Sequence, residues 1–263
     1  MNYRLADRIK VVKIGGNVVD DPEALSRFIE NFKRMAGPKV LVHGGGKEAT
    51  RLSDALGIET VMIDGRRVTS AETIDVCTMI YAGLINKRIV ALLQASGIDA
   101  IGLTGADAGV ITATRRPPHP VDYGFVGDID PLDVDDSVIS GFLKNGVVPV
   151  FCAIMHDGCG QLLNCNADSV AAAVAVAASR ISAVDLIYCF EKAGVLADAS
   201  DNNSVFRLID PEVYSELKES GVVNKGMIPK IDNCMKALRE GVSEVYIKSA
   251  DNLLEPTGTL ITL

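Results

Sequence analysis

The fold is indicated most clearly by residues 39–56, which read KVLVHGGGKEATRLSDAL. An apolar run of strand length leads into three glycines at positions 44–46, and the apolar residues after them have helical spacing. In an open α/β sheet, ligands bind at such strand-to-helix turns, where the helix N-terminus offers free N–H groups and the positive end of its dipole. Since three glycines exceed what a turn requires, we expect Gly45 and Gly46 to approach a ligand.

The same alternation of strand and helix runs through most of the chain. Apolar runs predict strands at 9–14, 39–42, 60–63, 100–103, 147–152, 184–189, 244–247 and 259–262, and helical spacing predicts helices at 22–35, 46–56, 71–95, 166–179, 211–219 and 227–240. We expect a bend at Gly83 and β-hairpins in residues 105–130, which are rich in Gly, Pro and Asp. The pattern predicts one α/β domain, a three-layer αβα sandwich with a mainly parallel central sheet.

Composition and charge exclude several classes of protein. The 263 residues include 26 Lys and Arg against 34 Asp and Glu, a net charge of −8, so a nucleic-acid partner is not expected. The longest apolar run, residues 170–178, is too short to span a membrane. The first ten residues lack the layout of a signal peptide, and the six cysteines form no C-x-x-C pair. We therefore expect a reduced, cytoplasmic protein without a membrane partner.

Lysines at two places suggest an anion site. The first predicted strand ends in Lys13, and the backbone N–H groups of Gly15 and Gly16 after it can approach an anion. A second stretch, KGMIPK at 225–230, predicts a helix start. Its two lysines have the wrong sign for the helix dipole unless an anion lies nearby. Taken singly, each stretch also fits an ordinary strand edge or helix start.

Other polar residues are candidates for substrate contacts. Arg66 and Arg67 can form a bidentate clamp for a carboxylate or phosphate, although exposed arginine pairs are often solvated surface. At the start of an Ala-rich helix, Asn166 fits an N-cap and Asp168 a stabilising charge in the first turn. Neither role accounts for Asn164, which can project into a cleft.

In their order along the chain, these motifs resemble the amino-acid kinase family, and within it the branch that phosphorylates N-acetyl-L-glutamate. The matching stretches are VKIGG at 12–16, VHGGG at 42–46, DGRRVT at 64–69, NK at 86–87, GL at 102–103, GFVG at 124–127, NCNAD at 164–168 and GMIPK at 226–230. Each stretch alone is weak evidence for the family, but the set occurs in the family's order and covers almost the whole chain.

The resemblance implies an enzyme that transfers the γ-phosphoryl group of ATP, bound as its Mg²⁺ complex, to the side-chain carboxylate of an N-acylglutamate. In the family this is the second step of arginine biosynthesis. The catalytic residues would be Lys13, Lys230 and Asp168, with Asp168 holding both lysines in place. A carboxylate acceptor is already ionised at neutral pH, so no general base is needed. The Mg²⁺ would be held by ATP oxygens and water, so we expect no metal ligand from the protein.

The resemblance also assigns binding residues. Gly45, Gly46, Arg67 and Asn164 would hold the amino-acid substrate, with Arg67 on its α-carboxylate and Arg66 facing outward. The nucleotide would be bound by Gly15, Gly16, Glu191, Lys192, Gly194, Leu196 and Met227. The part of the chain before about residue 180 would bind the amino acid and the part after it ATP, as halves of one continuous sheet.

Two stretches depart from the family pattern. Residues 189–194 read CFEKAG where the family has Thr/Ser-Asp-Val-x-Gly, so Glu191 would replace an aspartate at the ribose. Residues 152–155 read CAIM where the family has Ala-Pro-Ile-Gly. This second departure leaves the acyl group open between acetyl and a larger group such as succinyl, whose carboxylate would find Arg115 or Arg116.

Other functions stay open on the sequence alone. Gly44, Gly46 and Ala49 match the G-x-G-x-x-A pattern of a dinucleotide site, and Asp64 follows Gly44 by twenty residues, as in an NAD-dependent oxidoreductase. A different kinase of the same family, acting on aspartate, carbamate, glutamate or a nucleoside monophosphate, is a second alternative. A small-molecule sensor without catalysis is a third.

The resemblance finally predicts an assembly. Members of the family that L-arginine inhibits carry an extra N-terminal helix, which links dimers into a hexamer. Since the first predicted strand begins near residue 9, we expect a homodimer that L-arginine does not inhibit.

Overall fold

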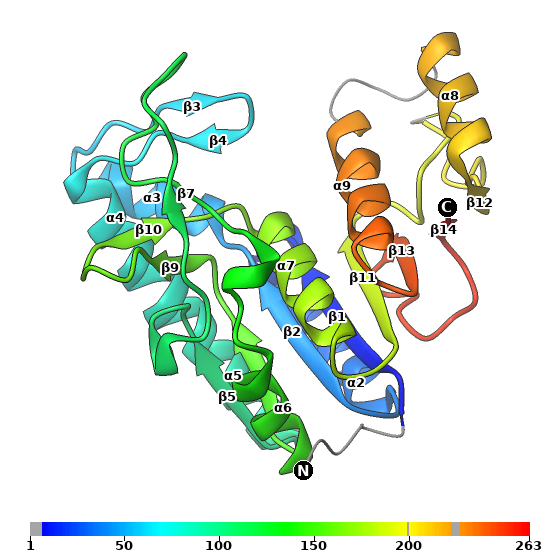
Figure 1. The fold of residues 1–263 in the computed structure, drawn as a ribbon, viewed down its shortest axis with the longest axis horizontal. Helices are drawn as coiled ribbons and strands as arrows, with labels where there is room; N and C mark the ends of the chain where they lie inside the picture. The colour runs from blue at the N-terminus through cyan, green and yellow to red at the C-terminus, as the bar shows by residue number, and fades with distance from the viewer. Residues whose placement is uncertain (1–6, 199, 222–226) are drawn as a thin grey trace.

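The computed structural model describes residues 7–198, 200–221 and 227–263, and it is built on one eight-stranded sheet (Figure 1). The strands are β1 (Ile9–Ile14), β2 (Lys39–His43), β5 (Ala100–Leu103), β8 (Val148–Phe151), β11 (Val184–Phe190), β12 (Leu208–Ile209), β13 (Glu244–Ser249) and β14 (Thr259–Ile261). They lie in the order β12-β14-β13-β11-β1-β2-β8-β5, and every neighbouring pair is parallel except β13 with β14. The predicted mainly parallel sheet is confirmed.

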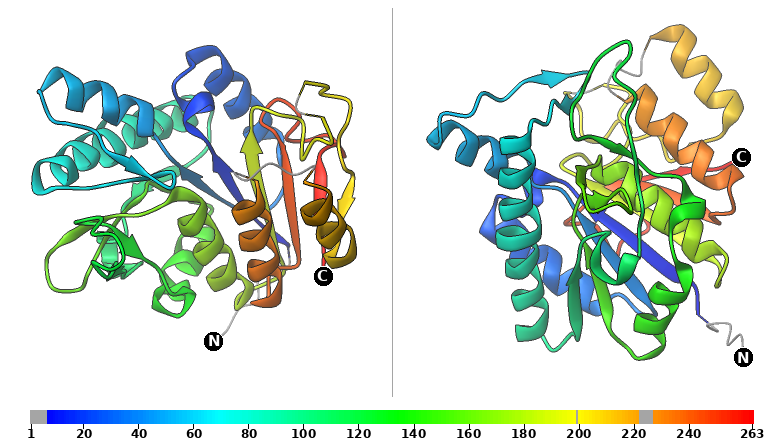
Figure 2. Two further views of the ribbon diagram at one scale, coloured as in Figure 1. Left: turned by 90° about the horizontal axis from the view of Figure 1, so that it is seen from above. Right: turned by 60° about the vertical axis from the view of Figure 1, so that its left-hand side comes forward.

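Helices cover both faces of this sheet (Figure 2). One face carries α2 (Pro22–Arg34) and α5 (Asn86–Ala95), and the other carries α6 (Asp136–Lys144), α7 (Ala167–Ser179) and α9 (Ile228–Arg239). At the sheet edge, α8 (Pro211–Ser220) packs beside β12. The chain therefore forms the three-layer αβα arrangement that the sequence predicts.

The central strands are apolar because helices cover them on both faces. In β1 every residue except Lys10 is buried, and all of β2 is buried. Over them lies α7, whose apolar residues are only alanine and valine, so its backbone approaches the sheet closely. Asn166 caps this helix as predicted, since its Oδ1 accepts hydrogen bonds from the N–H groups of Asp168 and Ser169.

The helix predicted at 71–95 is continuous but not uniform. It consists of α4 (Ala71–Thr78), a π-helical segment (Met79–Ile85) and α5. Gly83 therefore lies within a π-helical segment. In the described part of the chain this is the one helix long and apolar enough to cross a membrane. Ile85 and Ile89 are nevertheless buried in the hydrophobic core, as in a core helix.

One predicted strand is wrong in its pairing. The sequence predicts a sheet strand at 60–63, but only β3 (Met62–Ile63) forms, and it pairs with β4 (Arg66–Arg67) in a separate antiparallel hairpin. Asp64 and Gly65 form the turn with φ values of 49° and 73°. Asp-Gly with two positive φ angles is typical of a tight two-residue hairpin, which competes with extension into the main sheet.

Other short elements complete the substrate side. The hairpin expected within 105–130 is present, as β6 (Thr114–Arg115) paired with β7 (Gly127–Asp128). A second hairpin, β9 (Ile154–His156) with β10 (Leu162–Asn164), and the helix α6 were not predicted. These segments are short, so their periodicity is too weak to detect in the sequence.

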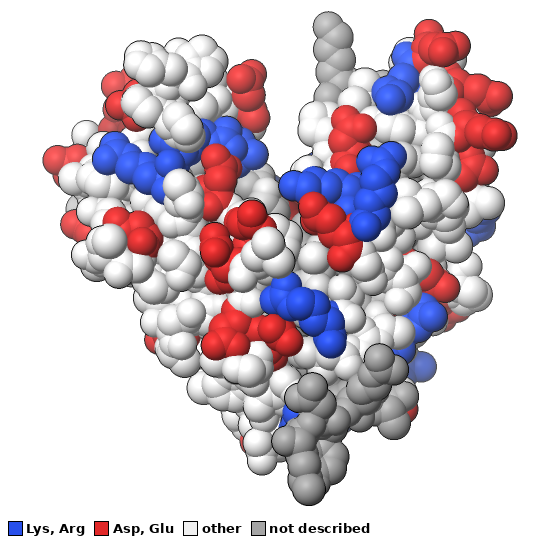
Figure 3. All heavy atoms as spheres, viewed as in Figure 1, with Lys and Arg blue, Asp and Glu red and all other residues white. Residues whose placement is uncertain are grey.

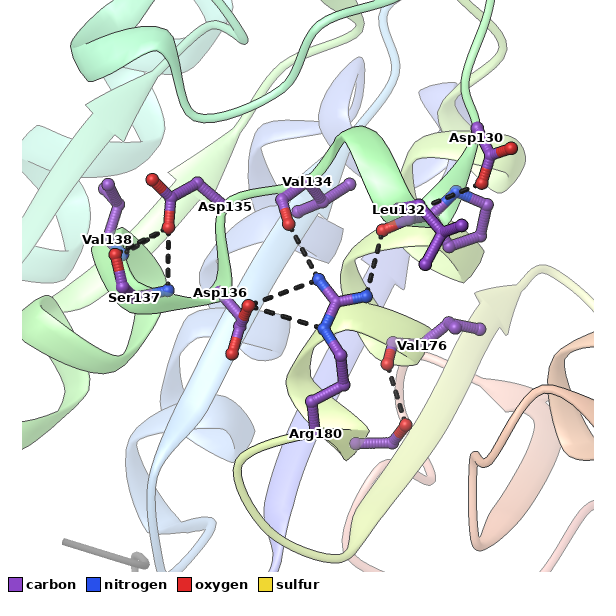
Figure 4. A network of polar contacts seen from close by, with 11 residues as sticks. Asp130, Leu132, Val134, Asp135, Asp136, Ser137, Val138, Val176 and Arg180 are labelled. Atoms are coloured by element: carbon purple, nitrogen blue, oxygen red, sulfur yellow. Dashed lines mark hydrogen bonds and ion pairs between the residues drawn. The ribbon is translucent and has the colours of Figure 1, made fainter. Parts of the chain in front are cut away.

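Arg180 anchors the C-terminal end of α7 (Figure 4). Its Nη2 donates to the backbone O of Val134 at 2.7 Å, its Nη1 donates to the backbone O of Pro131 at 3.2 Å, and the guanidinium pairs with Asp136 at 3.3 Å. These contacts tie α7 to a 3₁₀ turn, Pro131–Asp133, and to the first turn of α6. The far end of α7 carries Asp168, so this anchor helps to fix the helix that positions that carboxylate.

Candidate active site

The carboxyl ends of the central strands lie below a hollow in the molecular surface. In Figure 3 the hollow opens between two lobes, and Lys and Arg side chains gather on both of its walls. Two glycine turns meet there: Gly15 precedes a short helix α1 (Gly16–Val19), and Gly45 precedes α3 (Gly46–Ala55). The turns are neighbours, because the N–H of Gly44 donates to the backbone O of Ile14.

The turn at Gly45 is packed against the π-helical segment. A Cβ on Gly45 would collide with Cδ1 of Ile85 and would lie 3.2 Å from Cδ1 of Tyr81. Only glycine fits this position without displacing those side chains. The π-helix therefore shapes the turn from behind, a role that the sequence pattern does not reveal.

A buried polar network holds the residue before this turn. His43 is fully buried, which lowers its pKa to about 4, so the ring is neutral near pH 7. Its Nδ1 lies 2.8 Å from the backbone O of Gly44, and its Nε2 lies 3.1 Å from Nδ2 of Asn86. Asn86 Nδ2 also donates to the backbone O of Val150 at 2.9 Å. Since the Asn86 amide is a donor, Nε2 of His43 accepts and Nδ1 carries the proton.

Lys13 and Asp168 form an ion pair at the end of β1. Nζ of Lys13 lies 2.7 Å from Oδ1 of Asp168, although the angles do not make a hydrogen bond. Lys13 is only 7% exposed, and Asp168 lies in the first turn of α7, where the helix dipole favours a carboxylate. The hydroxyl of Tyr188 donates to the backbone O of Asp168 at 3.1 Å and fixes that turn further.

Lys230 approaches the same place from α9. Its Nζ lies 4.0 Å from the centre of the Phe190 ring. Burial lowers the pKa of Lys230 below its ordinary value of 10.5, and Lys13 lowers it further, whereas the Asp168 charge raises it. In the described part of the chain no carboxylate lies within ion-pair distance of Lys230. The structure therefore places Asp168 in direct contact with Lys13 and at longer range from Lys230. Pro229 lies in the first turn of α9 as predicted, whereas Lys225 and Gly226 fall outside the described residues.

A cavity of about 170 Å³ brings together four residues predicted to bind the amino acid. Its walls are Gly44, Gly45, Gly46, Met62, Gly65, Arg66, Arg67, Tyr81, Val126, Ala153, Asn164, Cys165, Asn166 and Ala167. The sequence does not single out Tyr81 or Cys165 as wall residues, because they come from segments that only the fold brings together. Ala153 belongs to the departure at residues 152–155, which the sequence already links to the acyl group.

Arg67 is fixed in the wall of this cavity. Its Nη2 donates to Oγ1 of Thr50 at 2.7 Å and to the backbone O of Gly46 at 2.9 Å, and its Nη1 donates to Oγ1 of Thr60 at 3.1 Å. Arg67 is buried and Arg66 is half-buried. Asn164 is buried as well, and its Nδ2 donates to Oγ1 of Thr69 at 3.1 Å. The guanidinium is therefore held in place before any ligand binds.

A second cavity, of about 240 Å³, contains most of the residues predicted to bind the nucleotide. Its walls are Gly15, Asn17, Val18, Cys189, Phe190, Glu191, Lys192, Gly194, Met227 and Lys230. Two predicted residues are not in these walls: Gly16 begins α1, and Leu196 pairs with Val205 in an isolated bridge. The remaining wall residues, Asn17, Val18, Cys189 and Phe190, were not among the predicted site residues.

Comparisons with known proteins agree with this arrangement. The model of the Amino acid kinase family matches residues 8–249. The chain is 50% identical over 249 residues to the acetylglutamate kinase of Cytophaga hutchinsonii, covering 94% of each protein. It is 46% identical over 257 residues to the acetylglutamate kinase of Phocaeicola vulgatus, covering 98% of this chain and 99% of that one. Among solved structures, smu.665 from Streptococcus mutans UA159 superposes with a TM-score of 0.79 at 32% identity, over 97% of this chain and 98% of that chain.

Proposed function

Because the chain belongs to the amino acid kinase family, we propose that it transfers the γ-phosphoryl group of ATP to the side-chain carboxylate of N-acetyl-L-glutamate. The products are ADP and the acyl phosphate, and the reaction is the second step of arginine biosynthesis. Both curated relatives described above are acetylglutamate kinases and match over nearly their full length. The family resemblance drawn from the motifs is thereby confirmed.

The observation that carries the mechanism is that Lys13 and Lys230 both lie beside the ring of Phe190. Lys13 comes from β1 and Lys230 from α9, and both lie near Asp168 and Phe190. A carboxylate acceptor needs no base, so the rate depends on alignment and on positive charge around the transferring group. Two ammonium groups from different elements, β1 and α9, fit that requirement.

We propose the following roles for the binding residues. Arg67 and Asn164 hold the amino acid in the first cavity together with the turn at Gly45 and Gly46, and Arg67 clamps the α-carboxylate. The nucleotide occupies the second cavity, with its phosphates near Gly15 and Gly16. Glu191 faces the ribose, Lys192, Gly194 and Met227 line the site, and Leu196 supports the turn behind them. Mg²⁺ binds with ATP, held by phosphate oxygens and water.

The two substrate-binding parts share one sheet. Residues up to about 180 contribute β1, β2, β5 and β8, and those from about 181 contribute β11, β12, β13 and β14. Since β1 pairs with β11 directly, the proposed amino-acid part and ATP part meet along this strand pair. Transfer between the two cavities then occurs over the ends of these two strands.

The dinucleotide alternative has no support. The relatives with the highest identity described above are kinases. In the structure Asp64 lies in the turn of the β3–β4 hairpin, outside the parallel sheet. A ribose-binding acid belongs at the end of a strand of that sheet, so the spacing match at Gly44, Gly46 and Asp64 is accidental.

The acyl group is proposed to be acetyl. Arg115 and Arg116, the predicted partners of a longer acyl chain, have other contacts: Arg115 donates to the backbone O of Gly124, and Arg116 pairs with Asp128. Neither arginine lines the first cavity, whereas Arg66 does. An acyl group with its own carboxylate would therefore form an ion pair with Arg66 in this cavity.

We also propose a homodimer that works in the cytoplasm. The helix at 71–95 leaves Met79 55%, Leu84 40% and Leu92 36% exposed, and large exposed apolar side chains on one helix favour contact with a second copy. All six cysteines are free, which fits a reducing compartment.

An assay of ADP release tests the proposed function. The acceptors are N-acetylglutamate, N-succinylglutamate, glutamate and aspartate, each with MgATP. We expect rapid ADP release only with an N-acylated glutamate. MgATP should also raise the melting temperature of the protein, whereas NAD and NADP should not. Release with free glutamate or aspartate alone, or stabilisation by NAD, would contradict the proposal.

A further inference from the structure

The ring of Phe190 lies beside both lysines at the end of β11. Nζ of Lys230 is 4.0 Å and Nζ of Lys13 is 5.4 Å from the ring centroid. Both distances are within the roughly 6 Å over which an ammonium group is attracted to an aromatic face. The ring is therefore a contact that the two lysines share, although one comes from β1 and the other from α9.

Strand register explains how this contact arises. Lys13 is the register partner of Tyr188 in the parallel pairing of β1 with β11, and Phe190 follows two residues later on the same face. The ring of Tyr188 stacks on that of Phe190, with centroids 6.1 Å apart and planes at 13°. Tyr188 is buried and its hydroxyl donates to the backbone of Asp168. Phe190 is thus backed by a ring that is itself fixed to α7.

The charges around the two ammonium groups do not balance without substrate. Lys13 acts on Lys230 as a like charge that lowers its pKa, and Asp168 supplies one carboxylate for both. The thiol of Cys234 on α9 is neutral, because burial raises its pKa. At the outer wall of the second cavity, Glu191 and Lys192 are exposed and carry opposite charges. The positive charges of Lys13 and Lys230 are therefore compensated by one carboxylate, that of Asp168, and by neutral groups that attract cations, such as an aromatic ring.

We propose that Phe190 is a positioning residue, whose ring face holds Lys13 and Lys230 side by side for the transferring phosphoryl group. A second carboxylate in this place would also attract the lysines, but it would repel the incoming phosphates. An aromatic face attracts cations without carrying net charge, so the positive charge stays available to the substrate. The inference rests on the proposed function for the role of the lysines in catalysis, but the contact itself is present without substrate.

A graded series of fluorinated rings at position 190 tests this role. Phenylalanine with one, two or three ring fluorines keeps nearly the same volume while its face becomes less negative. We expect kcat to fall stepwise along the series, and Phe190→Leu to lower kcat roughly tenfold, with the KM for the acylglutamate almost unchanged. Phe190→Tyr, which keeps the aromatic face, should retain most of kcat.

Lysine titration gives a second measurement that does not depend on turnover. NMR of lysine labelled with ¹³C at Cε, in the ligand-free protein, follows the pKa of Lys230 directly. Since a ring face stabilises the protonated form, weakening the face should lower this pKa stepwise, and the alkaline limb of kcat should move to lower pH. The groups that also act on this pKa, Lys13, Asp168 and Cys234, are unchanged throughout the series.

Phe142→Leu is the matched control, because Phe142 is a half-buried phenylalanine of α6 that packs on the core away from both cavities. A flat kcat and a flat lysine pKa across the fluorine series would overturn the proposal, as would an equal loss of kcat in Phe142→Leu. If the pKa of Lys230 falls stepwise along the fluorine series but the protein phosphorylates none of the acceptors, the contact with Phe190 is supported and the proposed function is contradicted.

Discussion

Lys13 on β1 and Asp168 on α7 lie 2.7 Å apart where the helix layer meets the central strand of the sheet. The pair is largely shielded from water, with side-chain exposures of 9% and 19%. Breaking such a pair by removing one partner is costly, because a charge is left without compensation. The capped N-terminus of α7 and the anchor at Arg180 hold the carboxylate. The position of the Lys13 ammonium group thus depends on the first turn of α7, which carries Asp168.

The first prediction concerns the two lysines. Lys13→Ala and Lys230→Ala should each lower kcat by roughly 10²–10³-fold, with a smaller effect on either KM, because the ammonium groups stabilise charge that develops on the phosphoryl group. Steady-state kinetics with varied MgATP and N-acetylglutamate separates the two effects. Lys33→Ala, at an exposed position of α2, is the control and should behave as wild type. Near-normal turnover in both variants would exclude this mechanism.

The second prediction concerns pH. Burial lowers the pKa of Lys230, and the charge of Asp168 opposes that shift. Both lysines must be protonated to act, so kcat should fall as pH rises through the lowered pKa. Asp168→Asn removes the opposing charge, which lowers the pKa further and should move the alkaline limb of kcat to lower pH. Profiles of kcat against pH for wild type and variant decide the matter. Identical alkaline limbs would mean that Asp168 does not act on the lysine charge.

Two kinds of site residue could be predicted from the sequence: those with a local backbone role, and those in motifs that match the family in order, such as Lys13 and Arg67. Gly45 could be recognised because a turn between a strand and a helix needs glycines. Asn166 could be recognised because an N-cap is predicted from the residues that follow it in the sequence. Tyr81 was missed, although it lines the same cavity as Gly45. Nothing in the sequence around Tyr81 shows that it lies next to Gly45, because a π-helical segment brings it there. The contact of Phe190 with Lys230 likewise joins β11 to α9, which lie about forty residues apart in the sequence.

The third prediction separates the two arginines. Arg67→Ala should raise the KM for N-acetylglutamate strongly and the KM for ATP little, because a ground-state clamp contributes to binding of one substrate. Arg67 also holds Thr50 and the backbone of Gly46, so a moderate fall in kcat should accompany the change. Arg66→Ala is the control and should change the KM for N-acetylglutamate far less. The reverse result would show that Arg66 is the clamp.

The fourth prediction concerns assembly. If the helix at 71–95 forms the contact between two copies, Leu84→Glu should turn a dimer into a monomer in analytical ultracentrifugation, because a buried unpaired carboxylate opposes association. The far-UV circular dichroism should stay unchanged, since Leu84 is 40% exposed. Leu132→Glu, at an 81% exposed leucine elsewhere, is the control and should stay dimeric. A monomeric wild-type protein would contradict the dimer. A Leu84→Glu variant that stays dimeric would show that the contact lies elsewhere.

The fifth prediction concerns the acyl group. The first cavity offers Val126, Ala153 and Cys165 as apolar wall, which suits a methyl group, and Arg66 as its half-buried cation. We expect kcat/KM to favour N-acetylglutamate over N-succinylglutamate by roughly tenfold or more, since a second carboxylate next to an apolar wall loses hydration that one flexible arginine replaces only in part. Both substrates are measured on one enzyme preparation, and Arg66→Ala is compared with Arg116→Ala, whose side chain pairs with Asp128 outside the cavity. A preference for N-succinylglutamate that disappears in Arg66→Ala but persists in Arg116→Ala would show that Arg66 binds the acyl carboxylate and that acetyl is the wrong acyl group. A preference for N-acetylglutamate that neither substitution changes would leave the apolar wall as the source of selectivity.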